Sequence, residues 1–327
     1  MGNKEKLASL LEGSGEEFIS GSMIAKELGI SRAAVWKNIR LLEKDGYRIE
    51  AVNNRGYRLA DDNDIVSPEA LEKALGADRE LFAIEVLESV DSTSTYLKNH
   101  ADERPDRSVA ISEFQTGGRG RTGRSFFSPK GTGLYLSILL KQQISFADAG
   151  RLTTAAAVSA CRAIAACTDS EAKIKWVNDV FVNGKKVCGI LTEASVNYET
   201  GVPDWIVTGI GFNVYEPVEG FPEELREIAG AVTDRRRKDL RVRLAASFLR
   251  YFNEACADLK SPGLYSEYRK RCFILKSRIW VIRGEEKIPA EAADINEDFA
   301  LLVRYDDGTE EFLSAGEVSI RPGVGNI

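Results

Sequence analysis

Six glycines and three arginines lie close together between residues 113 and 137. The arginines are Arg119, Arg121 and Arg124, and a short apolar run of the kind that forms buried strands stands on each side of the segment. Glycine lets a backbone turn tightly and present its N–H groups to a ligand, while guanidinium groups suit carboxylates and phosphates. We therefore expect a loop between two strands that binds an anionic ligand.

Two nucleotide-binding motifs overlap this loop, and the residues that follow exclude both. The dinucleotide pattern G-x-G-x-x-G is matched by GRGRTG, and a P-loop with arginine for lysine is matched by GRGRTGRS. Each motif needs a helix at its last glycine, but the chain continues with RSFFSPKG, which cannot open one. A merely solvated basic loop is the remaining alternative, and Phe126, Phe127 and Pro129 argue against it.

A second group of polar residues lies in the predicted hairpin KWVNDVFVNGKKVCGI. Four of them would be unfavourable if buried without partners: Lys175, Asn178, Asp179 and Lys186. The Asn-Gly pair at 183–184 predicts a type I′ turn that brings Lys186 back towards Asn178 and Asp179. A lysine beside an anion-binding loop can neutralise charge that grows on a carboxylate or phosphoryl oxygen. A surface hairpin with ion pairs is the alternative, which suits Lys185 but not Lys186.

A third candidate is the start of a helix at Asp91, Ser92 and Thr93. Hydroxyl groups at such a place are most often plain helix caps. They could also donate to, or accept from, a neutral polar group of a ligand. Their neighbours in the fold decide between these two roles.

The composition excludes several kinds of chemistry. The chain has 327 residues, of which 43% are hydrophobic, with five cysteines that show no C-x-x-C spacing and a single histidine, His100. A zinc site of Cys and His ligands and a histidine-based triad are therefore not expected, and His100 is predicted to lie on the surface. The odd cysteine count and the lack of a signal peptide or a long apolar run predict a soluble protein of the reducing cytoplasm, without a membrane segment.

The N-terminal residues have the pattern of a winged helix. Helical apolar spacing covers 3–12, Ser20 or Ser22 precedes a short helix that ends at Leu28, and Ser31 precedes a longer helix to about Lys44. An alternating segment broken by NNRG follows and predicts a β-hairpin. Together these elements predict a winged helix-turn-helix.

Positive charge is concentrated on this part of the chain. Residues 31–60 contain seven Lys or Arg and three Asp or Glu, a local charge of +4, whereas the whole chain carries −6. A helical protein-docking module is the alternative, and the clustered charge favours DNA. The residues available to bases and phosphates are Ser31, Arg32, Lys37, Arg40 and, on the hairpin, Arg55.

The rest of the chain predicts two further domains. Strands, an Ala-rich helix at 148–167, two hairpin-like strand pairs at 173–195 and 204–215, and helices at 239–258 and 262–271 indicate an α/β domain with a mixed sheet. From Ser277 the chain alternates apolar and polar residues, which predicts a small β-barrel-like domain. We expect the three domains to cover residues 1–65, 66–272 and 273–327.

The two polar clusters resemble the signature stretches of biotin protein ligases. The similarity covers GRGRTGRSFFSPKGTGLYLS and KWVNDVFVNGKKVCGILTE, and the winged helix matches the bifunctional type that also represses biotin-synthesis genes. Lipoate ligases share the fold but not the GRGRxGR string. The resemblance implies an α+β multidomain protein with a winged helix-turn-helix, a catalytic domain of the class II aminoacyl-tRNA synthetase-like lipoate-biotin ligase fold, and a C-terminal SH3-like β-barrel.

The resemblance also implies roles for individual residues. Lys186 and Arg121 would be catalytic, with Lys186 between the biotin carboxylate and the α-phosphate of ATP. The residues implied to bind biotin are Ser92, Thr93, Ser94, Gln115, Arg119, Gly120, Arg121, Lys186 and Gly189. Those implied to bind the nucleotide are Arg121, Arg124, Phe126, Asn178, Asp179 and Asn213.

Two positions depart from the family pattern. Phe126 stands where the family usually has a tryptophan beside the adenine, and Val177 replaces the proline of K-W-P-N-D. A phenyl ring can still stack, though over less area. Neither departure removes a charged group, so we expect activity to survive.

The implied reaction has two steps. Biotin and ATP with Mg²⁺ give biotinyl-5′-AMP and pyrophosphate, and a lysine of a biotin carboxyl carrier protein then takes the biotinyl group. The implied partners are this carrier protein, operator DNA and a second copy of the chain as a homodimer. A transcription factor that only senses a small acid, and a ligase for lipoate or octanoate, are the alternatives. The full set of lysines and arginines argues against the first, and Gln115 with Ser92 and Thr93 argues against the second.

Overall fold

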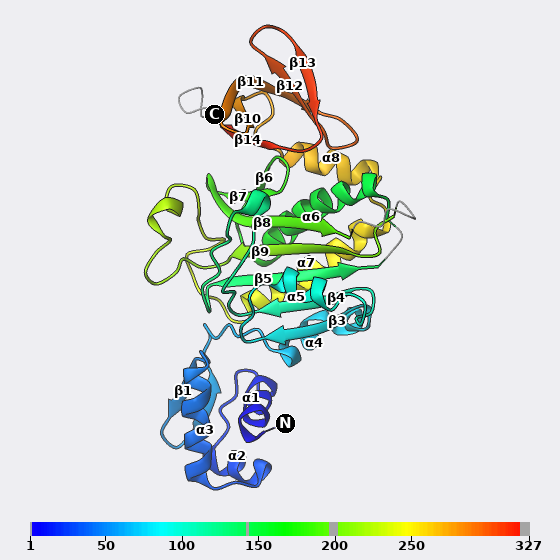
Figure 1. The fold of residues 1–327 in the computed structure, drawn as a ribbon. Helices are drawn as coiled ribbons and strands as arrows, with labels where there is room; N and C mark the ends of the chain where they lie inside the picture. The colour runs from blue at the N-terminus through cyan, green and yellow to red at the C-terminus, as the bar shows by residue number, and fades with distance from the viewer. Residues whose placement is uncertain (1, 142–143, 196–201, 321–327) are drawn as a thin grey trace.

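The computed structural model describes residues 2–141, 144–195 and 202–320. Three units follow one another along the long axis of the molecule: a helical N-terminal unit, a central seven-stranded sheet with its helices, and a C-terminal five-stranded sheet (Figure 1). None of the described helices is long and apolar enough to cross a membrane.

The N-terminal unit has the predicted helices and hairpin. It comprises α1 (Asn3–Gly13), α2 (Gly21–Leu28), α3 (Arg32–Lys44), β1 (Ile49–Val52) and β2 (Gly56–Leu59). The hydroxyl groups of Ser20 and Ser31 accept the N–H groups of Met23 and Ala34, each at 3.1 Å, and so cap α2 and α3. One face of each helix is buried in a small apolar core that contains Leu7, Leu11, Ile24, Val35, Ile39 and Leu42.

The central sheet is mixed, as the sequence predicts. Its strands are β3 (Ala83–Leu87), β4 (Ser108–Ser112), β5 (Gly133–Leu140), β6 (Lys173–Lys175), β7 (Asp179–Val182), β8 (Lys185–Ala194) and β9 (Ile206–Asn213). They lie in the order β3-β4-β5-β9-β8-β7-β6, and only the β3–β4 pair is parallel. The prediction of a strand pair at 204–215 is wrong, because this segment forms the single strand β9, which fills the gap between β5 and β8.

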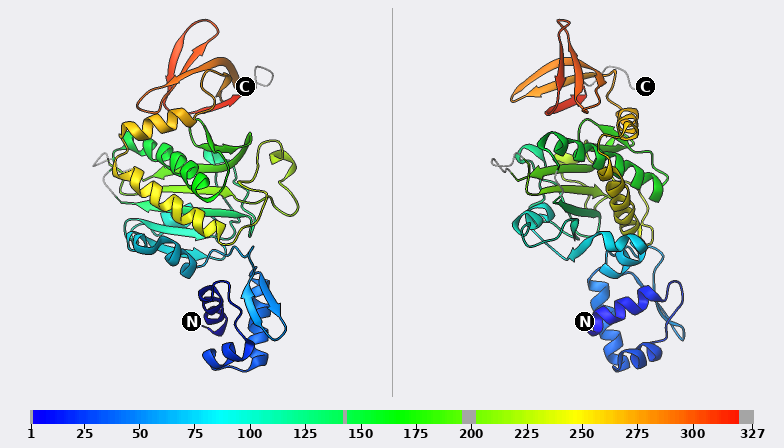
Figure 2. Two further views of the ribbon diagram at one scale, coloured as in Figure 1. Left: turned by 180° about the vertical axis from the view of Figure 1, so that it is seen from behind. Right: turned by 90° about the vertical axis from the view of Figure 1, so that its right-hand side faces the viewer.

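Helices cover the two faces of the sheet unequally. On one face lie α6 (Phe146–Cys167), α7 (Leu240–Ala257) and α8 (Pro262–Arg271), with α4 (Pro68–Leu75) near the β3 edge (Figure 2). Of the described helices, α5 (Thr93–Asn99) alone lies on the other face, where it packs in a small apolar cluster with Leu97, Ala110 and Val207. Short 3₁₀ turns occupy Gly76–Leu81, Arg121–Gly123 and Glu223–Leu225. Much of the second face is therefore left to loops.

The single histidine lies at the end of α5. His100 is half-buried, with Nδ1 2.8 Å from the carbonyl oxygen of Tyr96 and its ring 4.8 Å from the Tyr96 ring. The prediction that it lies on the surface is therefore wrong.

The C-terminal unit is a five-stranded antiparallel sheet. Its strands are β10 (Arg278–Arg283), β11 (Glu286–Ile295), β12 (Leu301–Tyr305), β13 (Glu310–Leu313) and β14 (Glu317–Ile320), in the order β13-β12-β11-β10-β14. Alternate residues such as Ile279, Val281 and Val303 are buried, as the period of two predicts. The indole N–H of Trp176 donates to the carbonyl oxygen of Phe299 at 2.9 Å and joins this sheet to the central one.

The hairpin of the winged helix leaves no room for a side chain at Gly56. This residue has φ +112°, and a Cβ atom added there would lie 2.0 Å from the carbonyl oxygen of Ile19. The same carbonyl accepts the N–H of Tyr57 at 2.9 Å, and this bond ties the hairpin to the segment before α2. Gly15 has φ +65° but no atom within 4 Å of an added Cβ.

We predict that Gly56→Ala lowers the unfolding free energy of the winged helix by about 3 kcal/mol, because it adds a backbone clash to an unfavourable φ. Gly15→Ala is the matched control and should lower that free energy by only roughly 1 kcal/mol, since it adds the unfavourable φ alone. Urea titration followed by hydrogen exchange of the α3 amides measures both. Equal losses in the two variants would contradict the clash.

Candidate functional site

A chain of hydroxyl and amide groups lines one end of the loop-covered face. The backbone N–H of Thr93 donates to Oε1 of Gln115 at 2.9 Å, and Nε2 of Gln115 donates to Oγ of Ser128 at 2.9 Å. Ser92 caps α5 by accepting the N–H of Thr95 at 3.4 Å. The structure thus brings Gln115 next to Ser92 and Thr93, although Gln115 is 22 residues beyond Thr93 in the sequence. Ser128 joins them without having been predicted.

Ser137 on β5 completes this hydroxyl cluster. Its side chain is fully buried, and its Oγ lies 2.7 Å from Oγ1 of Thr93 and 2.9 Å from Oγ of Ser94. Gly209 on β9 lies beside it, and a Cβ atom added there would be 2.4 Å from Oγ of Ser94. The sequence analysis missed Ser137, although a lone serine in the apolar strand GLYLSILL was an available signal. A buried group of neutral donors and acceptors suits a neutral polar ligand group.

Two glycines in register form the floor next to these hydroxyl groups. Gly189 on β8 pairs with Gly211 on β9, and the ring of Phe126 covers both. A Cβ atom added at Gly211 would lie 2.5 Å from Cε1 of Phe126, and one added at Gly189 would lie 3.1 Å from Cε2. The resemblance pointed to Gly189, whereas Gly211 was missed. Because these two residues have no side chains, the sheet has a flat apolar surface here on which one ring can lie.

Lys186 lies at the other end of this floor. Its Nζ forms an ion pair with Oδ1 of Asp179 at 2.6 Å, and both side chains are half-buried. The turn at 183–184 has φ +49° at Asn183 and +74° at Gly184, as a type I′ turn requires, and brings the two together as predicted. Lys185 points elsewhere, and its Nζ donates to the carbonyl oxygens of Arg226 and Glu227 at 3.0 and 2.8 Å.

The glycine- and arginine-rich loop folds into a small hairpin above the sheet. The N–H of Phe126 donates to the carbonyl oxygen of Gly118 at 2.8 Å, and the N–H of Gly120 donates to that of Arg124 at 2.7 Å. Only a 3₁₀ turn over Arg121–Gly123 forms after Gly120, so no described helix holds phosphates here. Thr122 at its tip has φ +53°. The exclusion of both nucleotide-binding motifs is confirmed.

The three arginines of the loop point to different places. Nη1 of Arg121 donates to Oδ1 of Asn178 at 3.1 Å, which directs this guanidinium towards β7 and Asp179. Arg124 is exposed and forms an ion pair at 2.8 Å with Glu317 on β14, while Arg119 is exposed. Through Arg121 and Arg124 the loop thus contacts both the central sheet and the C-terminal sheet.

Asn178 is held firmly beside the loop. Its Nδ2 donates to the carbonyl oxygen of Ile190 at 2.8 Å, and the N–H of Ile190 donates to the carbonyl oxygen of Asn178 at 3.1 Å. The preceding Trp176–Val177 bond is cis, and Tyr268 donates its hydroxyl to the carbonyl oxygen of Val177 at 3.0 Å. Asn213 ends β9 opposite Gly133, and no described hydrogen bond joins its side chain to Asn178 or Arg121.

Lys175 adds a further cation to this end of the site. It lies opposite Asp179 in the β6–β7 register. Burial lowers the pKa of its amine, and the positive charges of Lys186 and Arg124 lower this pKa too, while Asp179 and Glu317 raise it. Partly dehydrated amines and guanidinium groups beside one another favour a ligand with several negative charges. The sequence analysis noted Lys175 in the strand but gave it no role.

The predicted DNA-binding residues lie on or next to α3 and on the β1–β2 hairpin. Arg32, Lys37 and Arg40 are exposed on α3, and the hydroxyl of Ser31 is occupied as its cap. Arg55 on the hairpin stacks over the Phe18 ring at 4.4 Å. Trp36 is 55% exposed between them, a residue that the charge pattern did not indicate.

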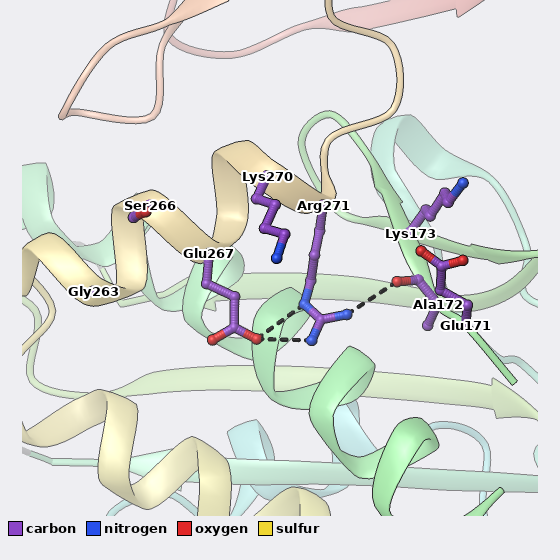
Figure 3. Close-up of a pocket in the computed structure, with 8 residues that line it drawn as sticks. All are labelled: Glu171, Ala172, Lys173, Gly263, Ser266, Glu267, Lys270 and Arg271. Atoms are coloured by element: carbon purple, nitrogen blue, oxygen red, sulfur yellow. Dashed lines mark hydrogen bonds and ion pairs between the residues drawn. The ribbon is translucent and has the colours of Figure 1, made fainter. Parts of the chain in front are cut away.

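A cavity of about 490 Å³ lies away from all of these residues, between α8 and the start of β6 (Figure 3). It is lined by charged side chains, of which Arg271 donates to Glu267 at 2.9 Å and to the carbonyl oxygen of Ala172 at 3.2 Å. It contains none of the predicted site residues. The glycine floor does not form such a cavity because the Phe126 ring fills it. Within the described ranges, no three His, Cys, Asp or Glu side chains gather to hold a metal ion.

Comparisons with known proteins agree with this arrangement. Residues 86–213 match the Biotin/lipoate A/B protein ligase family, and residues 3–58 match an HTH domain. The bifunctional ligase/repressor BirA of Bacillus subtilis is 36% identical over 70% of each chain, and that of Escherichia coli is 29% identical over 97% of this chain and 96% of its own.

A solved structure has the same fold over most of the chain. The biotin protein ligase from Aquifex aeolicus, in complex with biotin and ATP, is 26% identical and covers 73% of this chain and 98% of its own, with a TM-score of 0.59. Because both the helix-turn-helix and the ligase regions are matched in full-length relatives, the chain belongs to the biotin/lipoate A/B protein ligase family, among its bifunctional ligase/repressor members.

Proposed function

We propose that this protein activates biotin with ATP as biotinyl-5′-AMP, transfers the biotinyl group to a lysine of a biotin carboxyl carrier protein, and represses biotin genes with biotinyl-AMP as corepressor. The main support for this proposal is the order in which three kinds of surface follow one another across the central sheet. Neutral hydroxyl groups, a bare glycine floor and a group of cations follow one another. Biotin has the same order: a neutral polar ring, an apolar chain and a carboxylate.

The hydroxyl end fits the ureido part of biotin. Ser94 and Ser137 offer neutral donors and acceptors, and Thr93 and Gln115 extend them with fixed hydrogen bonds. A bare alkyl ligand would make no hydrogen bonds with these groups, whereas a ureido ring can both donate to and accept from them. The valeryl chain would lie over Gly189 and Gly211 and displace the Phe126 ring, which then becomes free to stack on the adenine.

The cationic end fits the reacting groups. A carboxylate oxygen of biotin attacks the α-phosphorus of ATP, the new P–O bond forms as the bond to the β-phosphate oxygen breaks, and pyrophosphate leaves. Lys186 and Arg121 would neutralise charge on the carboxylate and the α-phosphate, and Asp179 holds the Lys186 amine in place before the substrates arrive. Mg²⁺ would come with the nucleotide phosphates and supply further neutralisation.

The second step needs only correct placement. The amine of the carrier lysine attacks the acyl carbon of the mixed anhydride, a new amide bond forms, the bond to the phosphate oxygen breaks, and AMP leaves with the amine losing a proton. No side chain of the ligase need bond covalently to the substrate. The hairpin loop over the sheet would keep the anhydride from water until the carrier binds.

The winged helix would place α3 in the major groove and its hairpin on the adjacent backbone. A single module makes few base contacts, so we propose a homodimer on a two-fold symmetric operator. The C-terminal sheet would be an SH3-like barrel, and the domains would span 1–65, 66–272 and 273–327. All five cysteines are free, which fits the cytoplasm, where DNA and carrier protein are present.

We predict that Lys186→Ala slows biotinyl-AMP formation by about 100- to 1,000-fold, because it removes the charge beside the α-phosphate. Lys185→Ala removes the neighbouring amine, which contacts two backbone carbonyls and the exposed Glu227 carboxylate outside the site, and should leave the rate nearly unchanged. Pyrophosphate release measures both. The same assay with lipoate and octanoate tests specificity, and biotin should be the preferred acid. Near-normal release by Lys186→Ala would refute the assignment.

We also predict that Arg121→Ala slows adenylate formation less than Lys186→Ala does but releases the adenylate about 10 to 100 times faster, because a charge-assisted contact contributes roughly 1.5–3 kcal/mol. Lys130→Ala removes a positive charge from the same loop that pairs only with exposed Glu88, and it should retain the adenylate like the wild type. Rapid filtration of the enzyme with labelled biotin measures retention. Equal retention in both variants would mean that the loop does not hold the intermediate.

The protein should bind a two-fold symmetric operator as a dimer, more tightly with biotin and ATP present. Lys37→Ala should weaken binding and reduce the salt dependence by about one counterion, whereas Lys270→Ala, which removes an exposed lysine of α8, should do neither. Sedimentation and operator titration at several salt concentrations measure this. Operator affinity that ignores the adenylate would refute the corepressor role but leave the ligase assignment standing.

A further inference from the structure

The connection between the winged helix and the central domain is built from buried polar groups. Asn63 and Asp64 are only 2% and 3% exposed. Oδ1 of Asn63 accepts the N–H of Arg48 from the winged helix at 3.1 Å, and its carbonyl oxygen accepts the N–H of Asp239 before α7 at 3.0 Å. The acidic segment DDNDIVSP at 61–68 therefore forms a fixed joint between the two units.

One arginine lies at the centre of this joint. Arg241 in the first turn of α7 is 1% exposed, and Asp64 accepts its backbone N–H at 2.9 Å and lies 3.4 Å from its Nε. Its Nη2 donates to the carbonyl oxygen of Asp64, and the hydroxyl of Tyr215 donates to the Asp64 carboxylate. A buried guanidinium between carboxylates is strongly destabilised when one partner leaves.

The other side of the same guanidinium holds the ligand loop. Nη1 of Arg241 donates to Oε2 of Glu113 at 2.8 Å and to the carbonyl oxygen of Gly133 at 3.2 Å. Glu113 is the first residue after β4, which ends at Ser112, and Gly133 is the first residue of β5, so the two stand at the two ends of the loop. The N–H of Val66 in the joint also lies 3.4 Å from Oε1 of Glu113. Both ends of the loop thus share one cation with the joint.

We propose that Arg241 positions the two ends of the ligand loop and couples the state of this loop to the joint that carries the winged helix. This inference rests on the proposed function and adds its physical connection. The loop ends cannot shift without changing the partners of a buried charge, so ordering of the loop over the adenylate favours one arrangement of the joint. Coupling of this kind is reciprocal: whatever the adenylate does to DNA affinity, DNA does to adenylate affinity.

Two isosteric substitutions separate the two sides of Arg241. Asp64→Asn removes the charge on the joint side, and Glu113→Gln removes it on the loop side. Glu12→Gln is the matched control, because Glu12 is a half-buried carboxylate of the same domain boundary that accepts from Tyr47 and Ser67 and, among the described residues, forms no hydrogen bond or ion pair with Arg241.

The readout is the ratio of operator affinity with biotin and ATP to operator affinity without them. In the wild type and in Glu12→Gln we expect a ratio of about 5 to 150, the usual range for allosteric coupling. In Asp64→Asn the ratio should fall to within about twofold of one, while the rate of pyrophosphate release stays near that of the wild type. A merely structural role would lower stability without changing the ratio, so a normal ratio in Asp64→Asn overturns the proposal.

A second measurement needs neither activity nor DNA. Hydrogen exchange of the loop amides at 118–126 should be about tenfold faster in Asp64→Asn than in the wild type, and unchanged in Glu12→Gln. If Asp64→Asn does not fold, exchange of the Arg48 amide in Glu113→Gln tests the same coupling from the loop side. Normal exchange at these positions refutes the coupling, whether or not the wild type makes the adenylate. A wild type that makes no adenylate would instead refute the proposed function.

Discussion

The site depends on the absence of side chains where β8 and β9 meet. Gly189, Gly209 and Gly211 lie on adjacent strands, and a Cβ atom at Gly209 or Gly211 would collide with a side chain that belongs to the site. A sheet normally covers its face with alternating side chains. Here the strands keep their pairing but leave the backbone bare over this patch, which gives a flat ligand room while the opposite face stays packed against helices.

The charged end of the site is already paired without a ligand. Asp179 neutralises Lys186, Asn178 accepts from Arg121, and Glu317 of the C-terminal sheet pairs with Arg124. These partners keep the cations in place. Breaking the ion pairs costs little free energy, because the pairs at the loop are partly solvated. Substrate anions would therefore exchange one set of partners for another.

The sequence predicted the elements whose information is local. The serine caps predicted where helices begin, and the Asn-Gly turn predicted the position of Lys186. The alternation of apolar and polar residues predicted the C-terminal sheet. The sequence did not give Ser137 or Gly211, because their importance comes from strands that pair across long separations. For the same reason β9 was mistaken for two strands, and Arg241 looked like an ordinary residue at a helix start.

The exposed ion pair between Arg124 and Glu317 has a consequence for how the chain divides into modules. One loop of the central domain contacts the C-terminal sheet at its tip and, through Glu113, the N-terminal connector at its base. The connector after the winged helix and the C-terminal sheet thus contact the same segment of about twenty residues. A fragment cut at either predicted domain boundary would lose one of these contacts, so we expect the isolated central domain to hold the loop less firmly than the intact chain does.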